Sequence, residues 1–183
     1  MNIAGTHIDT GLLVVLVVVG GVLLSILTYH ILRFLRGSIK LTLPRTTFNA
    51  GEAITGNFEL QTKKELEGNK LLVSLIGVRV TKSHRNGKSH THTDEIYRDA
   101  VVIEEARPYP AGYLANYSFT LKTPNWKEPE FFNSTIGQTL TTAFKLLGSS
   151  SSYIKWKIEA RLDAKGVDLA TSKAVSLNTQ GMF

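Results

Sequence analysis

The 183-residue sequence contains no cysteine. Disulfide bonds, thiol nucleophiles and thiolate metal ligands are therefore excluded. The absence agrees with a reducing compartment such as the cytoplasm, where disulfides are rare. The sequence also lacks the G-x-S-x-G, phosphate-loop and dinucleotide-binding patterns, and no pair of carboxylates stands apart from ordinary outward charges. We therefore expect a protein that is not an enzyme and that binds no cofactor.

Formal charge is missing from one long stretch. From Gly11 to Leu32 the chain runs for twenty-two residues without a charged side chain. A helix rises about 1.5 Å per residue, so this stretch is long enough for a hydrocarbon core of about 30 Å. A buried core helix is the competing interpretation, but the stretch is too long and is apolar on every face. The sequence therefore predicts a transmembrane helix over residues 11–35, after an extracytoplasmic tail at residues 1–10.

The flanking charges set the predicted orientation. A cleaved signal peptide carries positive charge before its apolar run, whereas the first ten residues here carry only Asp9. The positive side chains follow the stretch, at Arg33, Arg36, Lys40 and Arg45. By the positive-inside rule, the amino terminus lies outside and the remaining chain lies in the cytoplasm.

The chain beyond Gly37 has a modest basic excess. Its 146 residues, enough for one domain with its own core, hold nineteen Lys and Arg against fourteen Asp and Glu. Such an excess is expected beside an anionic leaflet, where each basic residue contributes about 1 kcal/mol. The sequence has no Arg-rich run and no interleaved aromatic platform, so nucleic acid is not an expected partner.

Alternating apolar and polar residues dominate this region and predict strands. In the clearest pattern, Tyr153–Ala164, Trp156 falls on the apolar face, and we expect it to be buried. Seven such segments predict an all-β, immunoglobulin-like antiparallel sandwich over residues 38–178, followed by a tail at 179–183. The segments are Ser38–Leu43, Ala53–Gln61, Leu71–His84, Ser89–Val102, Tyr113–Lys122, Tyr153–Ala164 and Val167–Leu177.

Three local signals interrupt the alternation. The apolar parity of Leu71–His84 changes at Gly77, which predicts a β-bulge that returns the later apolar residues to the inner face. Asn86-Gly87 predicts a two-residue hairpin turn. Ser134–Leu147 has helical spacing and predicts one inserted helix, and Lys63–Asn69 predicts a loop. Trp126 lies in a proline-containing loop before the helix, so we expect it to be partly exposed.

Four motifs follow one another along the chain: Phe48-x-x-Gly51-Glu52-x-Ile54-x-Gly56-x-Phe58, the break at Gly77, Tyr117-x-Phe119-x-Leu121-x-x-Pro124, and Trp156-x-Ile158-x-Ala160-x-Leu162-Asp163 followed by Asp168, Lys173 and Val175. Their order resembles that of arrestin-like proteins, whose clan includes the retromer subunit of similar fold and bacterial sporulation-control proteins. The resemblance covers about Ile39 to Leu177, although the family usually has two sandwiches in tandem and no preceding membrane helix. It implies a single amino-terminal-type sandwich that binds other proteins and catalyses nothing. The family's phosphate-sensing charges match no position here.

Two surfaces are candidates for contact with a protein partner or the membrane. One is the basic hairpin around Asn86-Gly87, near an anionic surface or an acidic peptide. The other is the apolar stripe of the inserted helix, which packs on its own sheet, on the membrane or on a partner, its own sheet being the default. The candidate residues are Arg79, Lys82, Arg85 and Lys88 in the hairpin and Leu140 and Phe144 in the helix.

One pattern in the hairpin suggests a metal. His90, His92 and Asp94 share one strand parity, so they face the same side. A two-residue turn pairs His84 with Ser89, on the opposite face from His90 and His92, which excludes a three-histidine site. We expect an exposed polar hairpin without a metal.

Together these patterns favour a single-pass, membrane-anchored, non-enzymatic adaptor or scaffold that binds another protein at the cytoplasmic face. The alternative is an extracytoplasmic sandwich that binds a ligand or metal and is held by an uncleaved signal anchor. The two hypotheses differ in the side of the membrane on which the sandwich lies.

Overall fold

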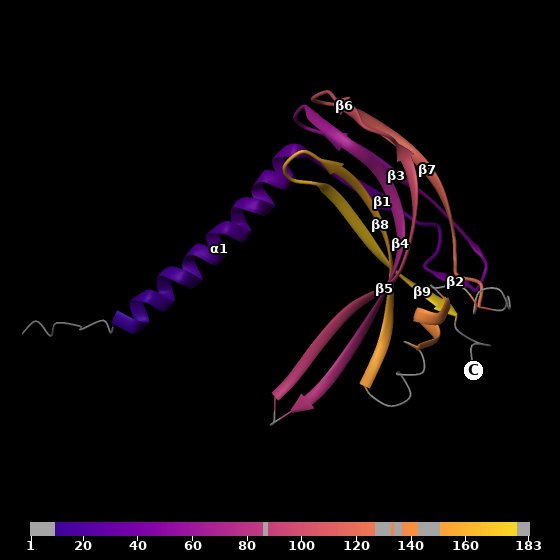
Figure 1. Cartoon of the computed structure of the whole chain (residues 1–183). Coiled ribbons are helices and arrows are strands. Elements are labelled where there is room, and N and C mark those ends of the chain that lie inside the picture. Colours follow the sequence, from indigo (N-terminus) through magenta and orange to yellow (C-terminus); the bar gives the residue numbers. More distant parts are fainter. Residues whose placement is uncertain (1–9, 86–87, 127–132, 134–136, 143–150, 179–183) are drawn as a thin grey trace, which may run out of the picture.

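One long helix leads into a set of β-strands (Figure 1). The computed structural model describes residues 10–85, 88–126, 133, 137–142 and 151–178. Within these residues the elements are α1 (Thr10–Arg36), β1 (Gly37–Thr42), β2 (Thr47–Asn49), β3 (Ala53–Thr62), β4 (Leu66–Arg85), β5 (Lys88–Glu104), β6 (Arg107–Tyr109), β7 (Leu114–Lys122), β8 (Ser151–Ala164) and β9 (Leu169–Asn178).

The strands form two sheets that pack into a sandwich. The smaller sheet has the order β1-β3-β7, and the larger has the order β2-β9-β8-β4-β5 with β6 paired to β4. Every described pairing is antiparallel except that of β2 with β9. Buried apolar side chains from both sheets form one core, which confirms the predicted all-β sandwich. Its seven predicted strands are present.

Two short strands were missed by the sequence patterns. β2 and β6 have three residues each, too few to show an alternating period. The loop predicted at Lys63–Asn69 is confirmed only for residues 63–65, because Leu66 pairs with Tyr109 of β6 and Gly68 with Arg107. β4 therefore begins at Leu66 and runs for twenty residues.

Trp156 belongs to the core and is 5% exposed, as its strand parity predicts. Its ring meets Tyr97 edge-on, with centroids 5.4 Å apart. Gly77 lies opposite Trp156 in the β4–β8 pairing. A Cβ atom at Gly77 would approach the indole to 2.8 Å, so the absence of a side chain makes room for the ring.

The predicted bulge is present, but its effect is different from the predicted one. The β4–β5 register shifts between Gly77 and Val78, and the extra residue lies in β5. The β4–β8 register continues past the same point without a shift, pairing Val78 with Lys155. Strand β4 therefore keeps its own alternation, and Val78 faces the outer side of the sheet instead of returning to the core.

The prediction that Trp126 is partly exposed is wrong. Its side chain is 1% exposed and belongs to the core cluster. The preceding loop is tied to the β2–β3 turn, because the Thr123 hydroxyl donates to the Asn49 carbonyl over 2.8 Å and the Thr123 N–H donates to the Glu52 carbonyl over 3.0 Å. The proline-containing loop is therefore packed, and its indole is buried.

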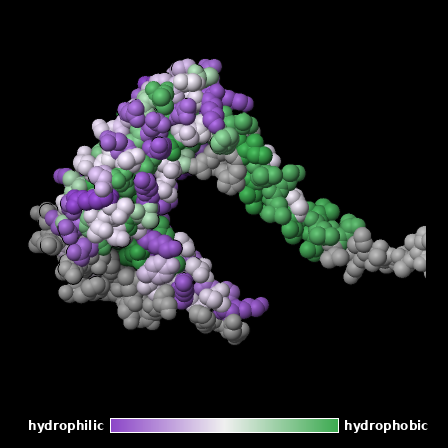
Figure 2. Space-filling view, turned by 180° about the vertical axis from the view of Figure 1, so that it is seen from behind, coloured by the Kyte–Doolittle hydropathy of each residue, from purple (hydrophilic) through white to green (hydrophobic). Residues whose placement is uncertain are grey.

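Helix α1 runs for 27 residues and extends away from the sandwich (Figure 1). Its surface is predominantly apolar (Figure 2). The described side chains are continuous from Leu13 to Thr28, and all of them are exposed. Among the residues that the structure describes, no helix is both long enough and apolar enough to cross a membrane. The helix predicted at residues 11–35 is thus present, whereas the membrane span is not found in the described part.

The burial of both indoles predicts that the two tryptophans are equally sensitive to truncation. Trp126→Ala and Trp156→Ala should each lower the free energy of unfolding by about 3–5 kcal/mol, since each removes a large buried ring and leaves a cavity. Denaturation of the full-length chain in mild detergent measures this. Single-tryptophan variants should both emit in the blue and resist iodide. Strong iodide quenching of Trp126 would contradict its place in the core.

Candidate interaction surface

The carboxyl end of α1 is fixed to two neighbouring segments, the loop at Lys63-Lys64 and the turn at Lys165. The Arg36 carbonyl accepts hydrogen bonds from the N–H groups of Lys63 at 2.8 Å and Lys64 at 3.4 Å. The Arg36 guanidinium donates to the Lys165 carbonyl at 2.6 Å. The Lys63 ammonium lies 3.5 Å from the centre of the Phe34 ring. α1 therefore continues into β1 without a linker, and exposed lysines surround the junction.

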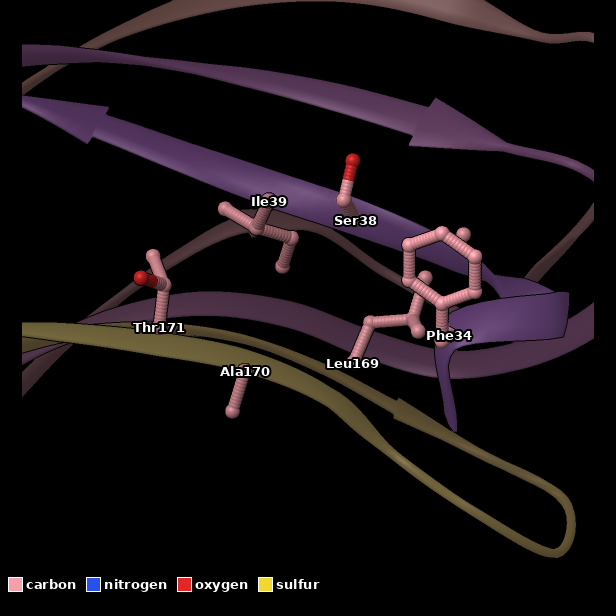
Figure 3. A pocket seen from close by; sticks show the side chains of 7 residues that line it. Phe34, Ser38, Ile39, Leu169, Ala170 and Thr171 are labelled. Carbon is pink, nitrogen blue, oxygen red and sulfur yellow. The ribbon is translucent and has the colours of Figure 1, made fainter. Parts of the chain in front are cut away.

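A groove opens beside this junction, between the two sheets. Its volume is about 400 Å³, and Figure 3 shows Phe34 beside Leu169 at one end and Ile39 between the two strands. β1 supplies one wall and the first half of β9 supplies the other. The lining residues are Phe34, Gly37, Ser38, Ile39, Leu169, Ala170 and Thr171.

Both walls of the groove are open strand edges. β1 pairs with β3 on one side and, among the described residues, with no strand on the other. β9 pairs with β8 along Leu169–Val175, whereas β2 covers its other edge only from Ser176 to Asn178. Unpaired main-chain groups of this kind are able to hydrogen-bond an added strand. Sequence patterns could not find this feature, because a strand's edge position depends on the sheet order.

The hairpin register agrees with the predicted two-residue turn. Arg85 pairs with Lys88 and His84 with Ser89, so His84 lies on the opposite face from His90, as expected. The candidate basic residues divide between the two faces. Arg79, Arg85 and Lys88 share one parity, and Lys82 has the other.

Arg79 is not a free cation. Its guanidinium donates to Asp94 at 2.8 Å, and His92 Nε2 lies 2.7 Å from the other Asp94 oxygen. The hydrogen bond from Arg79 holds the pKa of Asp94 below its ordinary value. Both oxygens of the carboxylate are thereby engaged. Within the described residues no group of three His, Cys, Asp or Glu side chains is placed to hold a metal ion.

Lys82 belongs to a small cluster that the sequence patterns did not identify. Tyr153 is 39% exposed on β8, and the ammonium groups of Lys82 and Lys155 lie 6.0 and 5.5 Å from the centre of its ring. The parity of β8 predicts that Lys155 faces water. That Lys82 of β4 lies on the same face, beside Tyr153, depends on the β4–β8 register, which the sequence does not show.

The second candidate surface, the apolar stripe of the inserted helix, is part of the core at Leu140. Leu140 is fully buried and belongs to the core cluster, so the helix packs on its own sandwich at this position. Leu140 is therefore not a partner or membrane contact. Phe144 lies outside the described residues.

A partly buried polar network lies at the end of the sandwich near β6. Glu104 accepts hydrogen bonds from Arg107 at 2.9 Å, Tyr109 at 2.7 Å and Tyr117 at 2.9 Å. The hydroxyls of Tyr113 and Tyr117 are 2.9 Å apart. Burial raises the pKa of Tyr109 and Tyr117 well above the ordinary tyrosine value. Glu104 lies on β5, Arg107 and Tyr109 lie on β6, and Tyr117 lies on β7, so these hydrogen bonds link the three strands.

Comparison with known proteins supports the fold. No protein-family model and no curated protein matches the chain. Among solved structures it is similar to Spo0M, a sporulation control protein from Bacillus subtilis, with a TM-score of 0.52 and 13% identity. The fold is arrestin-like. The match covers 79% of this chain and 50% of the other, so this chain spans about half the length of that relative. At this identity the likeness shows the fold alone.

The buried Tyr97 predicts a loss of stability in alkali. Burial raises its pKa to about 12, above the ordinary value of about 10. The neutral phenol is favoured in the folded chain, so its contribution is complete below about pH 10 and is lost as the pH rises through about 12. In thermal unfolding between these pH values, Tyr97→Phe should show a smaller pH dependence than the unchanged chain. Tyr153→Phe is the control, and an equal reduction there would contradict the assignment to Tyr97.

Proposed function

We propose that this protein is a membrane-anchored, non-enzymatic adaptor that binds an extended segment of another protein at the cytoplasmic face of the membrane. The observation that carries the proposal is the groove beside Phe34. There the unpaired edges of β1 and β9, one from each sheet, lie next to the carboxyl end of the exposed apolar helix α1. An arrestin-like sandwich is suited to such a role, because an open strand edge can bind an extended segment.

The uncharged stretch as a whole is long enough for α1 to serve as a membrane anchor. The described side chains of α1 are continuous for sixteen residues, Leu13–Thr28, whereas the uncharged stretch has twenty-two, Gly11–Leu32. The polar side chains in the described run satisfy their own hydrogen bonds, since Ser25 donates to the Gly21 carbonyl and Thr28 to the Leu24 carbonyl, each at 2.8 Å. Such internal bonding is what a helix in hydrocarbon requires. A helix this apolar on all sides is also costly to leave in water.

The lysines at the junction support a cytoplasmic sandwich. Lys63, Lys64 and Lys165 are exposed beside the last turn of α1. Basic residues next to a membrane helix favour the cytoplasmic side and the anionic lipids of that leaflet. The alternative, an extracytoplasmic ligand-binding sandwich, would place the same lysines on the opposite side of the membrane.

The open edges of β1 and β9 are suited to binding an extended segment of a partner. A peptide strand added to β1 or β9 would pair with their unpaired main-chain groups, and its side chains would enter the apolar part of the groove formed by Phe34, Ile39 and Leu169. The groove has no charged lining residue, so we expect a segment with apolar side chains at alternate positions. Main-chain pairing supplies the affinity, and the groove selects the side chains.

Labelling in intact cells tests the orientation. The chain has no cysteine, so Lys165→Cys provides a single thiol at an exposed turn beside α1. We expect an impermeant maleimide to leave it unlabelled until the cells are lysed, while Asn2→Cys is labelled directly. Labelling of Lys165→Cys in intact cells would favour the extracytoplasmic alternative.

Site-specific photocrosslinking tests the groove. A photoreactive residue replacing Ser38 or Thr171 should give the same discrete adduct with another protein, identified by mass spectrometry. The matched control replaces Asn57, which is exposed on β3, a strand paired on both sides. Equal adducts from Asn57, or adducts only between copies of this chain, would contradict the proposed edge site.

A further inference from the structure

The free end of the β4–β5 hairpin and α1 leave the same side of the sandwich. Figure 1 shows both directed away from the sheets toward the same side, and Figure 2 shows the hollow between them. β8 supports β4 only as far as Lys82, which pairs with Ser151. The β4–β5 pairing continues to Arg85 and Lys88. The last part of the hairpin therefore has no neighbouring strand among the described residues.

The uncompensated charges at this end are positive. Among the described residues Lys82, Lys88 and Lys155 are exposed and take part in no ion pair, whereas the charge of Arg79 is neutralised by Asp94. Lys82 and Lys155 flank the ring of Tyr153 on the outer face, and Lys88 lies on the other face. Both faces of the hairpin end thus carry free lysine charge.

We infer that this hairpin end is a second membrane contact, in which Lys82, Lys88 and Lys155 bind the phosphate groups of anionic lipids. The inference rests on the proposed anchoring of α1, because the hairpin end and α1 leave the sandwich toward the same side. Each lysine near an anionic surface changes binding about fivefold. Tyrosine, such as Tyr153 here, is enriched at the level of the lipid headgroups, because its ring is apolar and its hydroxyl stays hydrated.

A lipid surface fits this end better than an acidic protein does. The exposed aromatic between two lysines matches a membrane interface, where headgroup phosphates lie above acyl chains. The two lysines are held by an aromatic ring rather than by a carboxylate, so their charge remains available. Tethering through α1 also gives the hairpin a high effective concentration at the bilayer, so weak individual contacts suffice.

Lipid-dependent quenching on the full-length chain tests the inference. Ser89→Cys, at the exposed hairpin end, carries a fluorophore, and the chain is reconstituted into vesicles of phosphatidylcholine with or without phosphatidylglycerol. Headgroup-spin-labelled lipid is the quencher. We expect at least about fivefold stronger quenching with phosphatidylglycerol, lost in high salt. A fluorophore at Asn57→Cys, on the three-stranded sheet, should remain unquenched in both vesicles.

Charge reversal shows which lysines act. The combined change Lys82→Glu, Lys88→Glu and Lys155→Glu should abolish the phosphatidylglycerol-dependent quenching. The matched control reverses three exposed lysines elsewhere, Lys70, Lys122 and Lys173, and should keep it. Both variants have the same net charge, so a general charge effect would change them equally and would overturn the inference.

Flotation separates this inference from the proposed anchor. If the full-length chain does not float with vesicles of either composition, the proposed anchor is wrong and the hairpin contact is wrong with it. If it floats but the label at position 89 is unquenched, or is quenched equally without phosphatidylglycerol, the anchor stands and the lipid contact is overturned. An acidic protein as the true partner gives the second result, because the vesicles contain no other protein.

Discussion

The long pairing of β4 with β8 is the constraint on which the rest of the structure depends. Its register is continuous from Leu71 opposite Leu162 to Lys82 opposite Ser151. This register sets Gly77 against Trp156 and so makes room for the buried indole. It also fixes which hairpin residues face outward, because the bulge lies in β5 and leaves β4 unchanged. The core and the lysine cluster around Tyr153 are therefore two consequences of one pairing.

Local patterns in the sequence were sufficient for the elements that obey a regular period. The alternation around Trp156 and the uncharged helix each depend on neighbours in the chain, and each is present in the structure. The pairing of Arg85 with Lys88 likewise agrees with the predicted two-residue turn. Trp126 was assigned wrongly because its burial depends on hydrogen bonds between Thr123 and a turn some seventy residues earlier. No periodicity records a contact of that kind.

The candidate sites were harder to predict for the same reason. The lysine cluster at Tyr153 requires the register between two strands more than sixty residues apart, and the groove requires knowledge of which strands lie at sheet edges. The sequence places Arg79 among the basic residues of the hairpin, but Asp94 on the facing strand neutralises its charge. A sequence thus identifies the residue types of a surface, whereas strand order decides which of them remain available.

The proposed anchor joins these surfaces into one arrangement, with the groove and the hairpin end both held near the bilayer. Hydrogen–deuterium exchange of the full-length chain in lipid nanodiscs measures whether α1 lies in hydrocarbon. A membrane-spanning α1 should show one continuous block of protected amides over Gly11–Leu32, since water is absent from the hydrocarbon core. The free edges of β1 and β9 should exchange faster than β4. Rapid exchange throughout α1, equal to that of the exposed edges, would contradict the account.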